Sequence, residues 1–277
     1  MNKIITQLNG GLGNQFFQYA VAKAIAINNN LELSFDINEL ISYTFRGYDL
    51  NNFNIEENFA CDDEITQLKR KRVFKRTYFK EKRGKFMPEV LKIKNSAYLQ
   101  GFWQSEKYFK TVSDVIRKDF TFKNLDFIKN QPILDEIKQT NAVSISVRCK
   151  DYIENPETAK VHNVCSMQYY KDAIQYMKKN VENPIFYIFS DDIEWVKENF
   201  KFDEPVVLPN TSNWQEDLYF MQNCKHNIVA NSSFSWWAAW LNQNPDKIVV
   251  APKKWYTDIA KVDYKSVVPG NWVKIRV

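Results

Sequence analysis

The chain has 277 residues, of which 44% are hydrophobic, and its 38 Lys and Arg residues exceed its 33 Asp and Glu residues to give a net charge of +5. These values predict a globular protein with a core split over two domains, and the small charge excess argues against a dedicated nucleic-acid binder. No apolar run reaches the roughly 18 residues that cross a bilayer, and the N-terminus lacks the apolar segment of a signal peptide. We therefore expect a cytoplasmic protein.

Cysteine and histidine are too sparse and scattered for a typical metal site. The four cysteines are Cys61, Cys149, Cys165 and Cys224. Without a C-x-x-C pair they argue against both a zinc site and a disulfide framework, and two histidines are too few for a His-rich centre. We expect free thiols, and any metal would need carboxylate ligands.

The first twenty residues combine a β-branched run, a glycine-rich turn and a helix. Residues 4–6 predict a strand, and residues 16–27 predict an amphipathic helix. The glycines of the turn, which permit close backbone approaches, are Gly10, Gly11 and Gly13. Such a unit places amide N–H groups and a positive helix end beside an anion. It indicates either a phosphate or carbohydrate site or a plain tight turn, and the amides of Asn14 and Gln15 favour a site that holds hydroxyls.

The middle of the chain is less regular. Residues 31–35 predict a second strand, and residues 43–59 predict an irregular surface segment. Residues 69–85 contain ten Lys and Arg residues, which we interpret chiefly as a solvated helix face; docking to acidic lipid headgroups or to a phosphorylated acceptor is the alternative. RNA binding is not expected, because this is one local run without an RNA-binding motif. Residues 98–103 predict a strand, a helix opens at 105–109, and aromatic side chains there would stack on a sugar or fill the core.

The second half alternates strands and helices. The predicted strands are residues 142–147, 184–189, 206–208, 227–230 and, as the final strand, 247–251. The predicted helices are residues 167–179 with Ser166 as cap, 193–200, 214–223 and 233–243. This alternation predicts a parallel, doubly wound sheet with right-handed crossovers. Ligands of such sheets bind outside the carboxyl ends of the strands, where three polar clusters fall: residues 148–151, 190–192 and 231–235.

Each of the three clusters suits a part of a nucleotide. The Arg148 guanidinium, fixed at a strand end, would grip a diphosphate through two parallel hydrogen bonds, and a salt bridge to Asp151 is the alternative. Asp191 and Asp192 would hold a guanine edge, ribose hydroxyls or Mg²⁺, while a helix N-cap is equally open to one of them. The hydroxyl and N–H groups of residues 231–235 would face the anion, and the tryptophans that follow are expected in the core.

Four motifs in order across nearly the whole chain carry a family resemblance. They are Gly10-Gly-Leu-Gly-Asn-Gln15 with Phe17-Gln-Tyr-Ala20, Ser146-Val-Arg-Cys-Lys-Asp-Tyr152, Phe189-Ser-Asp-Asp192 and Asn231-Ser-Ser-Phe-Ser-Trp-Trp237. Together they resemble the bacterial α-1,2-fucosyltransferases of glycosyltransferase family 11. The resemblance implies an α/β fold of the GT-B type, with two Rossmann-like domains facing each other across a cleft. Residues 1–135 would form the acceptor-side domain and residues 136–277 the GDP-fucose-binding domain.

The resemblance also implies the reaction. L-Fucose would pass with inversion from GDP-β-L-fucose to the 2-hydroxyl of a galactose-terminated oligosaccharide or lipid-linked glycan of a bacterial surface polysaccharide, without a metal or other cofactor. Peripheral contact with the inner face of the plasma membrane would run through residues 69–85. The alternatives are another GDP-sugar-dependent transferase with a different linkage, and a nucleotide-sugar-binding protein without turnover.

Site residues follow from the motifs one by one. The resemblance implies that Arg148 binds the diphosphate, that Asp191 lies near the guanosine and that Asn14 faces the reacting fucose. The full set expected to bind the donor is Gly11, Gly13, Ser146, Arg148, Asp191, Asn231, Ser232, Ser233 and Phe234. The family usually has His-Val-Arg-x-Gly-Asp, whereas this chain has Ser146 for the histidine and Lys150 for the glycine, with Cys149 between Arg148 and Lys150. Serine cannot stack or titrate like imidazole, which leaves the base preference open, while Lys150 adds charge near the diphosphate.

The chemistry itself sets two demands. The departing diphosphate gains negative charge that Arg148 and the backbone amides near Ser232 and Ser233 would stabilise. The acceptor hydroxyl needs a general base, for which the sequence offers Asp151 first, His162 second and Glu154 third. We expect His162 in a loop. The catalytic candidates are therefore Asn14, Arg148, Asp151 and His162.

Overall fold

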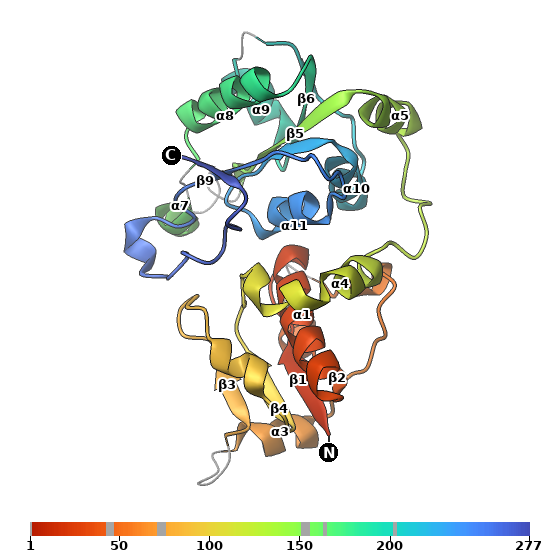
Figure 1. Cartoon of the computed structure of the whole chain (residues 1–277), viewed down its shortest axis with the longest axis vertical. Coiled ribbons are helices and arrows are strands. Elements are labelled where there is room, and N and C mark those ends of the chain that lie inside the picture. Colours follow the sequence, from red (N-terminus) through yellow and green to blue (C-terminus); the bar gives the residue numbers. More distant parts are fainter. Residues whose placement is uncertain (1, 43–46, 71–75, 151–155, 163–164, 202–203) are drawn as a thin grey trace. The chain divides into compact units, whose positions relative to one another are not determined.

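The structure is a computed structural model that describes residues 2–42, 47–70, 76–150, 156–162, 165–201 and 204–277. The chain forms two compact units, Met1–Asn124 with Lys265–Val267, and Leu125–Tyr264 with Val268–Val277, and each is built on a parallel sheet (Figure 1). Residues 125–135 belong to the second unit, in which the buried Glu216 carboxylate accepts hydrogen bonds from the amides of Lys129 and Asn130.

The N-terminal unit contains a four-stranded parallel sheet in the order β2-β1-β4-β3. Its strands are β1 (Lys3–Gln7), β2 (Glu32–Asp36), β3 (Tyr78–Lys80) and β4 (Ala97–Gln100). Its α-helices are α1 (Leu12–Asn29), α2 (Asn38–Ser42), α3 (Asp62–Lys69) and α4 (Ser113–Asp119), with short 3₁₀ turns at Leu50–Asn52, Pro88–Lys92, Glu106–Tyr108 and Lys110–Val112. Helix α1 begins four residues before the predicted start, because Gly11 serves as its extended N-cap, and it ends where Asn30 turns left-handed.

The interpretation of residues 69–85 as one solvated helix face is wrong for the part that the structure describes. Lys69 ends α3, whereas Tyr78–Lys80 is the edge strand β3, with Phe79 buried and Lys80 exposed. Charge density alone cannot distinguish an exposed helix from an edge strand, where lysines prevent pairing with another sheet. Residues 71–75 lie outside the described residues.

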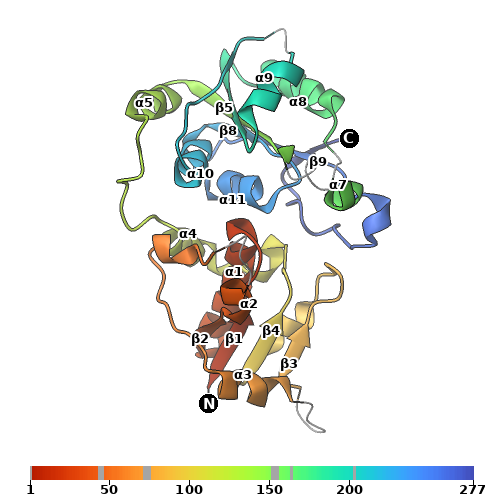
Figure 2. The ribbon, with the colours of Figure 1, turned by 180° about the vertical axis from the view of Figure 1, so that it is seen from behind.

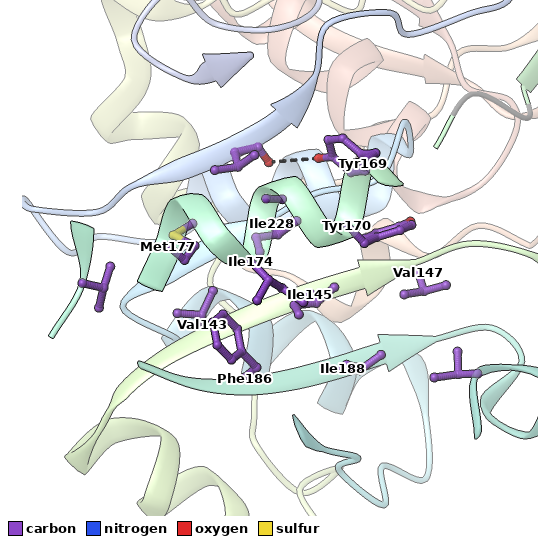
Figure 3. Close-up of a cluster of buried hydrophobic side chains, with 14 of the residues drawn as sticks. Val143, Ile145, Val147, Tyr169, Tyr170, Ile174, Met177, Phe186, Ile188 and Ile228 are labelled. Atoms are coloured by element: carbon purple, nitrogen blue, oxygen red, sulfur yellow. Dashed lines mark hydrogen bonds between the residues drawn. The ribbon is translucent and has the colours of Figure 1, made fainter. Parts of the chain in front are cut away.

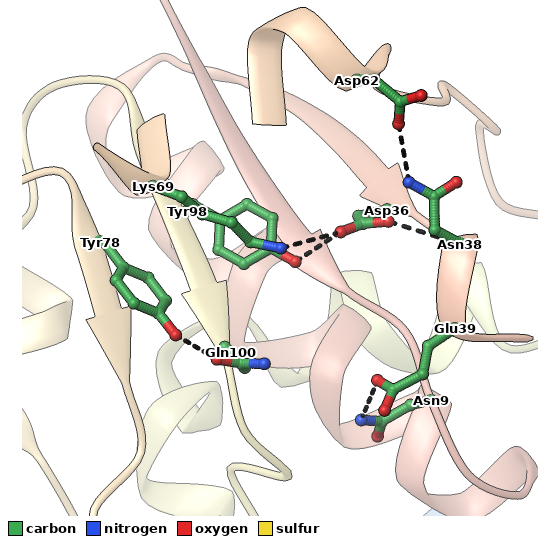
Figure 4. Close-up of polar contacts among 9 residues, drawn as sticks. All are labelled: Asn9, Asp36, Asn38, Glu39, Asp62, Lys69, Tyr78, Tyr98 and Gln100. Atoms are coloured by element: carbon green, nitrogen blue, oxygen red, sulfur yellow. Dashed lines mark hydrogen bonds and ion pairs between the residues drawn. The ribbon is translucent and has the colours of Figure 1, made fainter. Parts of the chain in front are cut away.

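A buried polar cluster joins the strands of this unit (Figure 4). The Asp36 carboxylate, only 3% exposed, accepts hydrogen bonds from the Tyr98 hydroxyl at 2.5 Å and the Asn38 amide at 3.1 Å. The ammonium of Lys69 lies 3.7 Å from the same carboxylate and 4.3 Å from the centre of the Tyr98 ring. Lys69 therefore neutralises a buried charge.

The C-terminal unit contains a six-stranded parallel sheet in the order β10-β9-β8-β5-β6-β7. Its strands are β5 (Asn141–Val147), β6 (Pro184–Ser190), β7 (Val206–Val207), β8 (His226–Ile228), β9 (Val249–Pro252) and β10 (Val273–Ile275). Its α-helices include α5 (Gln131–Gln139), α7 (Pro156–His162), α8 (Met167–Asn180), α9 (Ile193–Asn199), α10 (Trp214–Asn223) and α11 (Ser233–Leu241), and a 3₁₀ turn covers Asp258–Ala260. The predicted parallel, doubly wound sheet is confirmed, although β10 follows the strand that we expected to be the last.

The strand order of this sheet fixes where a ligand would bind. Counted along the chain from β5, the six strands lie in the order 3-2-1-4-5-6, which is the order of dinucleotide-binding sheets. The order reverses between β5 and β8, and ligands of such sheets bind at this switch point, beyond the carboxyl ends of the strands. Helices α8 and α9 lie on one face of the sheet and α10 and α11 on the other (Figure 2).

A cluster of buried side chains fixes α8 on the sheet (Figure 3). Helix α8 begins where the Ser166 hydroxyl accepts a hydrogen bond from the amide of Tyr169, as predicted. The buried members from α8 and the strands include Val143, Ile145, Val147, Tyr169, Tyr170, Ile174, Met177, Phe186, Ile188 and Ile228. Burial of each apolar side chain of this size is worth about 1.5 to 3 kcal/mol, and the Tyr169 hydroxyl donates a 2.6 Å hydrogen bond to the Val229 carbonyl. Helix α8 is therefore anchored on the strands that lead to the switch point.

Candidate active site

The described residues of the three polar clusters predicted from the sequence lie at one edge of the C-terminal sheet. Arg148 follows β5, Asp191 follows β6, and residues 231–235 follow β8. Strand β5 pairs in parallel with β6 on one side and β8 on the other, so all three segments leave the sheet at its carboxyl edge. Arg148 is half-buried and lies directly beside the switch point.

The N-terminus of α11 presents backbone N–H groups at the same switch point. Ser232 is the N-cap residue, but its side chain makes no capping hydrogen bond within the described part of the chain. Half-buried Ser233 and Phe234 form the first turn, and the Ser235 hydroxyl donates back to the Ser232 carbonyl at 3.2 Å. The first N–H groups of a helix have no partner inside it, and the positive end of the helix dipole favours an anion. This turn is suited to a phosphate group.

The amide of Asn231, which we predicted to bind the donor, is used inside the protein. Asn231 is 5% exposed, and its side-chain nitrogen donates to the carbonyls of His162 at 2.6 Å and Trp255 at 3.1 Å. Its side-chain oxygen accepts a 3.5 Å contact from the Cys165 thiol. Asn231 therefore ties the α11 turn to the end of α7 and to the segment after β9.

The tryptophans of the last motif are core residues, as expected. Trp236 and Trp237 are fully buried, with ring centres 5.0 Å apart, and Trp236 also packs against Trp272 at 5.4 Å. Trp240 lies against Trp237 at 5.2 Å. This packing anchors the first turn of α11 from behind and leaves stacking on a ligand to other residues.

Asp191 and Asp192 have different jobs. Asp192 is the N-cap of α9 and accepts a 2.9 Å hydrogen bond from the Trp195 amide, so the N-cap alternative is confirmed for this residue. The Asp191 carboxylate instead accepts hydrogen bonds from the backbone amides of Cys149 at 3.0 Å and Lys150 at 3.3 Å. Burial raises the pKa of the Cys149 thiol to about 12, so this thiol is neutral and unreactive at pH 7.

Two of the remaining candidate residues, Ser146 and His162, lie in regular secondary structure. Ser146 is a buried strand residue, and its carbonyl accepts a 3.2 Å hydrogen bond from the Tyr170 hydroxyl. His162 does not lie in a loop: it ends helix α7, because the Lys160 and Val161 carbonyls before it are bound by Thr257. The His162 ring is 5.2 Å from that of Tyr256. Asp151 and Glu154 lie outside the described residues.

The glycine turn of the N-terminal unit follows β1, which lies between β2 and β4 in the sheet. Gly10 has φ +72°, and a Cβ there would come within 2.7 Å of the Asn14 side-chain nitrogen. The Asn14 oxygen accepts a 2.9 Å hydrogen bond from Gln104, which follows β4. Gly11 and Gly13 are the N-cap and second residue of α1. Asn14 is half-buried, so it is held in place while part of it faces solvent.

Two further side-chain amides, both in α1, bind other parts of the protein. Gln15, which we expected to hold hydroxyls, is fully buried and donates to the carbonyls of Gly10 at 3.0 Å and Gly47 at 2.9 Å. Fully buried Gln18 donates to the Asn9 side chain at 2.7 Å and to the Gly101 carbonyl at 3.1 Å. Sequence reasoning missed the partner of Asn14, Gln104, although it directly follows a predicted strand, which was the available signal.

The described residues contain no group of three or more His, Cys, Asp and Glu side chains placed to hold a metal ion. Among their helices, none combines the length and the apolar character that a bilayer crossing requires.

Comparisons with known proteins identify the family of the chain. The profile of Glycosyl transferase family 11 matches residues 3–276. The chain belongs to glycosyl transferase family 11. The α-1,2-colitosyltransferase of Escherichia coli is 33% identical to this chain, with 99% of each chain covered. The O-antigen biosynthesis glycosyltransferase WbnK of Escherichia coli is 31% identical over 97% of this chain and 99% of that protein.

More distant relatives share part of the chain or only the fold. Galactoside α-(1,2)-fucosyltransferase 1 of Homo sapiens is 25% identical over 52% of this chain and 42% of its own length. A solved structure of a variant of Arabidopsis thaliana FUT1 in complex with GDP matches with a TM-score of 0.53 at 12% identity, covering 98% of this chain and 76% of that one. The fold of this family 11 glycosyltransferase is therefore of the α/β GT-B type, as predicted.

Proposed function

We propose that the protein is an inverting galactoside α-1,2-fucosyltransferase that uses GDP-β-L-fucose and needs no metal. The observation that carries the proposal is the placement of Arg148, after β5, and the N-terminus of α11, after β8, on the two sides of the switch point of the C-terminal sheet. A guanidinium and a helix N-terminus together provide a strong site for a diphosphate. Relatives that form α-1,2 linkages support the same reaction class.

The proposed reaction is a single displacement. The bond from fucose C1 to the GDP oxygen breaks with its electron pair on GDP, and the 2-hydroxyl oxygen of the acceptor attacks C1 from the opposite face. Arg148 and the N–H groups of Ser233 and Phe234 stabilise the charge that grows on the diphosphate. Asp151 accepts the hydroxyl proton, and Asn14 holds the fucose ring.

Removal of Arg148 tests the central assignment. We expect Arg148→Ala to lower turnover by about two to three decades, because one such contact is worth about 2 to 4 kcal/mol in the transition state. Arg148→Lys keeps the charge without the two parallel hydrogen bonds, so its turnover should lie between those of the wild type and Arg148→Ala.

The purified full chain is incubated with GDP-fucose and a panel of β-galactosides, and NMR follows GDP release and product linkage. If the unsubstituted chain releases no more GDP than Arg148→Ala does, the result would contradict turnover. A rise in melting temperature on addition of GDP would then indicate a nucleotide-sugar-binding protein without turnover.

Colitose is a second candidate for the transferred sugar. The 33% identity to an α-1,2-colitosyltransferase over 99% of both chains favours it. Colitose lacks the 3-hydroxyl of fucose, and a site built to hydrogen-bond a hydroxyl rejects the analogue that lacks it by about four to five decades. Equal kcat/KM values for GDP-fucose and GDP-colitose would show that the site makes no contact with the 3-hydroxyl. A strong preference for one of them would identify the donor.

The proposed acceptor is a galactose-terminated oligosaccharide or lipid-linked glycan, which fits the O-antigen biosynthesis for which the relative WbnK is named. The exposed side chains of Lys80, Lys82 and Lys85 favour contact of residues 69–85 with an anionic membrane. Shielding of the edge strand β3 is an alternative explanation for Lys80, which lies in that strand.

A further inference from the structure

We propose that Asp191 is a positioning residue that holds the Arg148 turn in its diphosphate-binding form, and that it is not a ligand of guanosine. The inference rests on the proposed function and adds to it, because it moves Asp191 from nucleotide recognition to support of the diphosphate site.

The geometry places Asp191 beside the turn that carries Arg148. Val147 and Ser190 are the last paired residues of β5 and β6, so Arg148 and Asp191 are the next residues on two adjacent strands. Oδ1 of Asp191 accepts the Cys149 amide at 3.0 Å and the Lys150 amide at 3.3 Å, and the Cys149 thiol lies 3.8 Å from it. One carboxylate oxygen thus holds the two backbone N–H groups that directly follow Arg148.

The segment that carries Asp191 is itself fixed. The Ser190 hydroxyl accepts the Asp192 amide at 3.1 Å and donates to the Asp192 carbonyl at 3.2 Å, and the Asp192 carboxylate caps α9. Asp191 therefore projects from a closed turn at the start of a helix. Hydrogen bonds from backbone amides to an ionised carboxylate are among the stronger ones in proteins, so this contact fixes where Arg148 leaves the sheet.

The same contacts argue against guanine recognition. An aspartate that reads guanine uses both oxygens for two neighbouring N–H groups of the base edge. In Asp191 the lone pairs of Oδ1 are occupied by the two backbone amides, which leaves only Oδ2 for a ligand.

A double-mutant cycle on GDP affinity tests the proposal. Isothermal titration of the full chain compares wild type, Arg148→Ala, Asp191→Ala and the double variant. If Asp191 acts through Arg148, Asp191→Ala weakens GDP binding by about tenfold or more in the wild-type background, as expected for contacts that share one network. In the Arg148→Ala background it should change GDP affinity by less than about threefold.

Two comparisons separate positioning from base recognition. Asp191→Asn keeps an oxygen that can accept both amides and should bind GDP within about threefold of wild type. IDP lacks the 2-amino group of GDP, so the ratio of the two affinities should be the same in wild type and Asp191→Ala. Asp192→Asn, which removes the neighbouring charge but still caps α9, is the matched control and should match wild type.

Amide hydrogen exchange adds a readout that needs no nucleotide. The peptide containing Cys149 and Lys150 should exchange faster in Asp191→Ala, whereas the α8 peptide should not change, which also shows that the variant is folded. Three results would overturn the proposal while leaving the proposed function intact. They are additive losses of GDP affinity in the double-mutant cycle, a ratio of GDP to IDP affinity that falls to about one in Asp191→Ala, and unchanged exchange of the peptide containing Cys149 and Lys150. Tighter GDP binding by Asp191→Ala would also overturn it, since the carboxylate would then compete with the phosphates. Absence of GDP binding by the wild type would instead remove the proposed function, and this inference with it.

Discussion

Two buried polar side chains of the C-terminal unit, Asn231 and Glu216, hold the fold together, because each satisfies several backbone groups. Glu216 is fully buried, and burial alone would raise its pKa, yet hydrogen bonds from Ser212, Lys129 and Asn130 lower it below its ordinary value.

Replacement of Asn231 should destabilise the protein even without a nucleotide. Asn231→Ala leaves the His162 and Trp255 carbonyls without their donor, and we expect a loss of about 2 to 3 kcal/mol, since buried polar groups that lose their partner cost this much. Asn231→Asp should be at least as destabilising, because it sets carboxylate oxygens against carbonyl oxygens. Urea unfolding without ligand measures both.

The control for this prediction is Asn199→Ala. The Asn199 side chain is exposed and donates a 2.9 Å hydrogen bond to the Trp195 carbonyl within α9, so its loss should stay within about 0.5 kcal/mol. Asn231 variants as stable as this control would mean that the Asn231 amide serves the ligand and not the fold.

At the level of elements, a strained turn follows strand β4. Gly101 has φ +154°, and a Cβ there would lie 2.3 Å from the Cβ of Glu81. The Glu81 carboxylate accepts the amides of Phe102 at 3.0 Å and Trp103 at 2.9 Å, and Trp103 itself has φ +55°. Gln104, which donates a hydrogen bond to Asn14, comes next, so this turn positions the partner of a candidate site residue.

Gly101→Ala should therefore be costly. We expect a loss of about 2 kcal/mol or more, because the new methyl group meets a Cβ that cannot move away, at a backbone conformation that alanine disfavours. Gly270→Ala is the control, since a Cβ on exposed Gly270 meets nothing within 4 Å. Equal unfolding midpoints in urea for the two variants would contradict the strain argument.

The elements show what the sequence could and could not predict. The helix over residues 214–223 and the Ser166 cap were predicted as observed, because hydrophobic period and capping residues are local signals. Helix α3, rich in acidic residues, and the three-residue strand β10 were missed, since neither carries enough apolar residues to show a period. The sequence allowed us to predict that Arg148 and Asp191 lie at one sheet edge, because both directly follow predicted strands of a parallel sheet. The hydrogen-bond partner of each carboxylate could not be predicted, because it depends on side-chain geometry and not on residue spacing.

For the whole molecule, histidine couples stability to pH. His226 lies in β8, and its Nδ1 accepts a 3.0 Å hydrogen bond from the Ile248 amide, which requires the neutral ring. Burial, and to a smaller extent the charge of Lys225, lowers the pKa of His226 below its ordinary value of 6.5. The unfolded chain therefore binds this proton at a higher pH than the folded protein does. The contribution to stability is complete above pH 6.5 and declines as the pH falls below it, by at most about 1.4 kcal/mol per pH unit.

Unfolding free energies measured in urea between pH 5 and 7.5 test this dependence. His226→Gln offers an uncharged acceptor for the Ile248 amide and should flatten the profile between pH 5 and 6.5. His162→Gln, which replaces the other histidine of the sequence, is the control and should keep the wild-type slope. The reverse result would assign the pH dependence to the end of α7.

Every pairing among the named strands of both sheets is parallel. No two neighbouring strands can be joined by a short hairpin, so each contact waits for a long crossover to close, and the entropy of that closure must be met before any pairing forms. Refolding from denaturant should accordingly be slow, with exposed strand edges competing for association between chains. Dilute protein and low temperature during recovery are the practical counterpart of this topology.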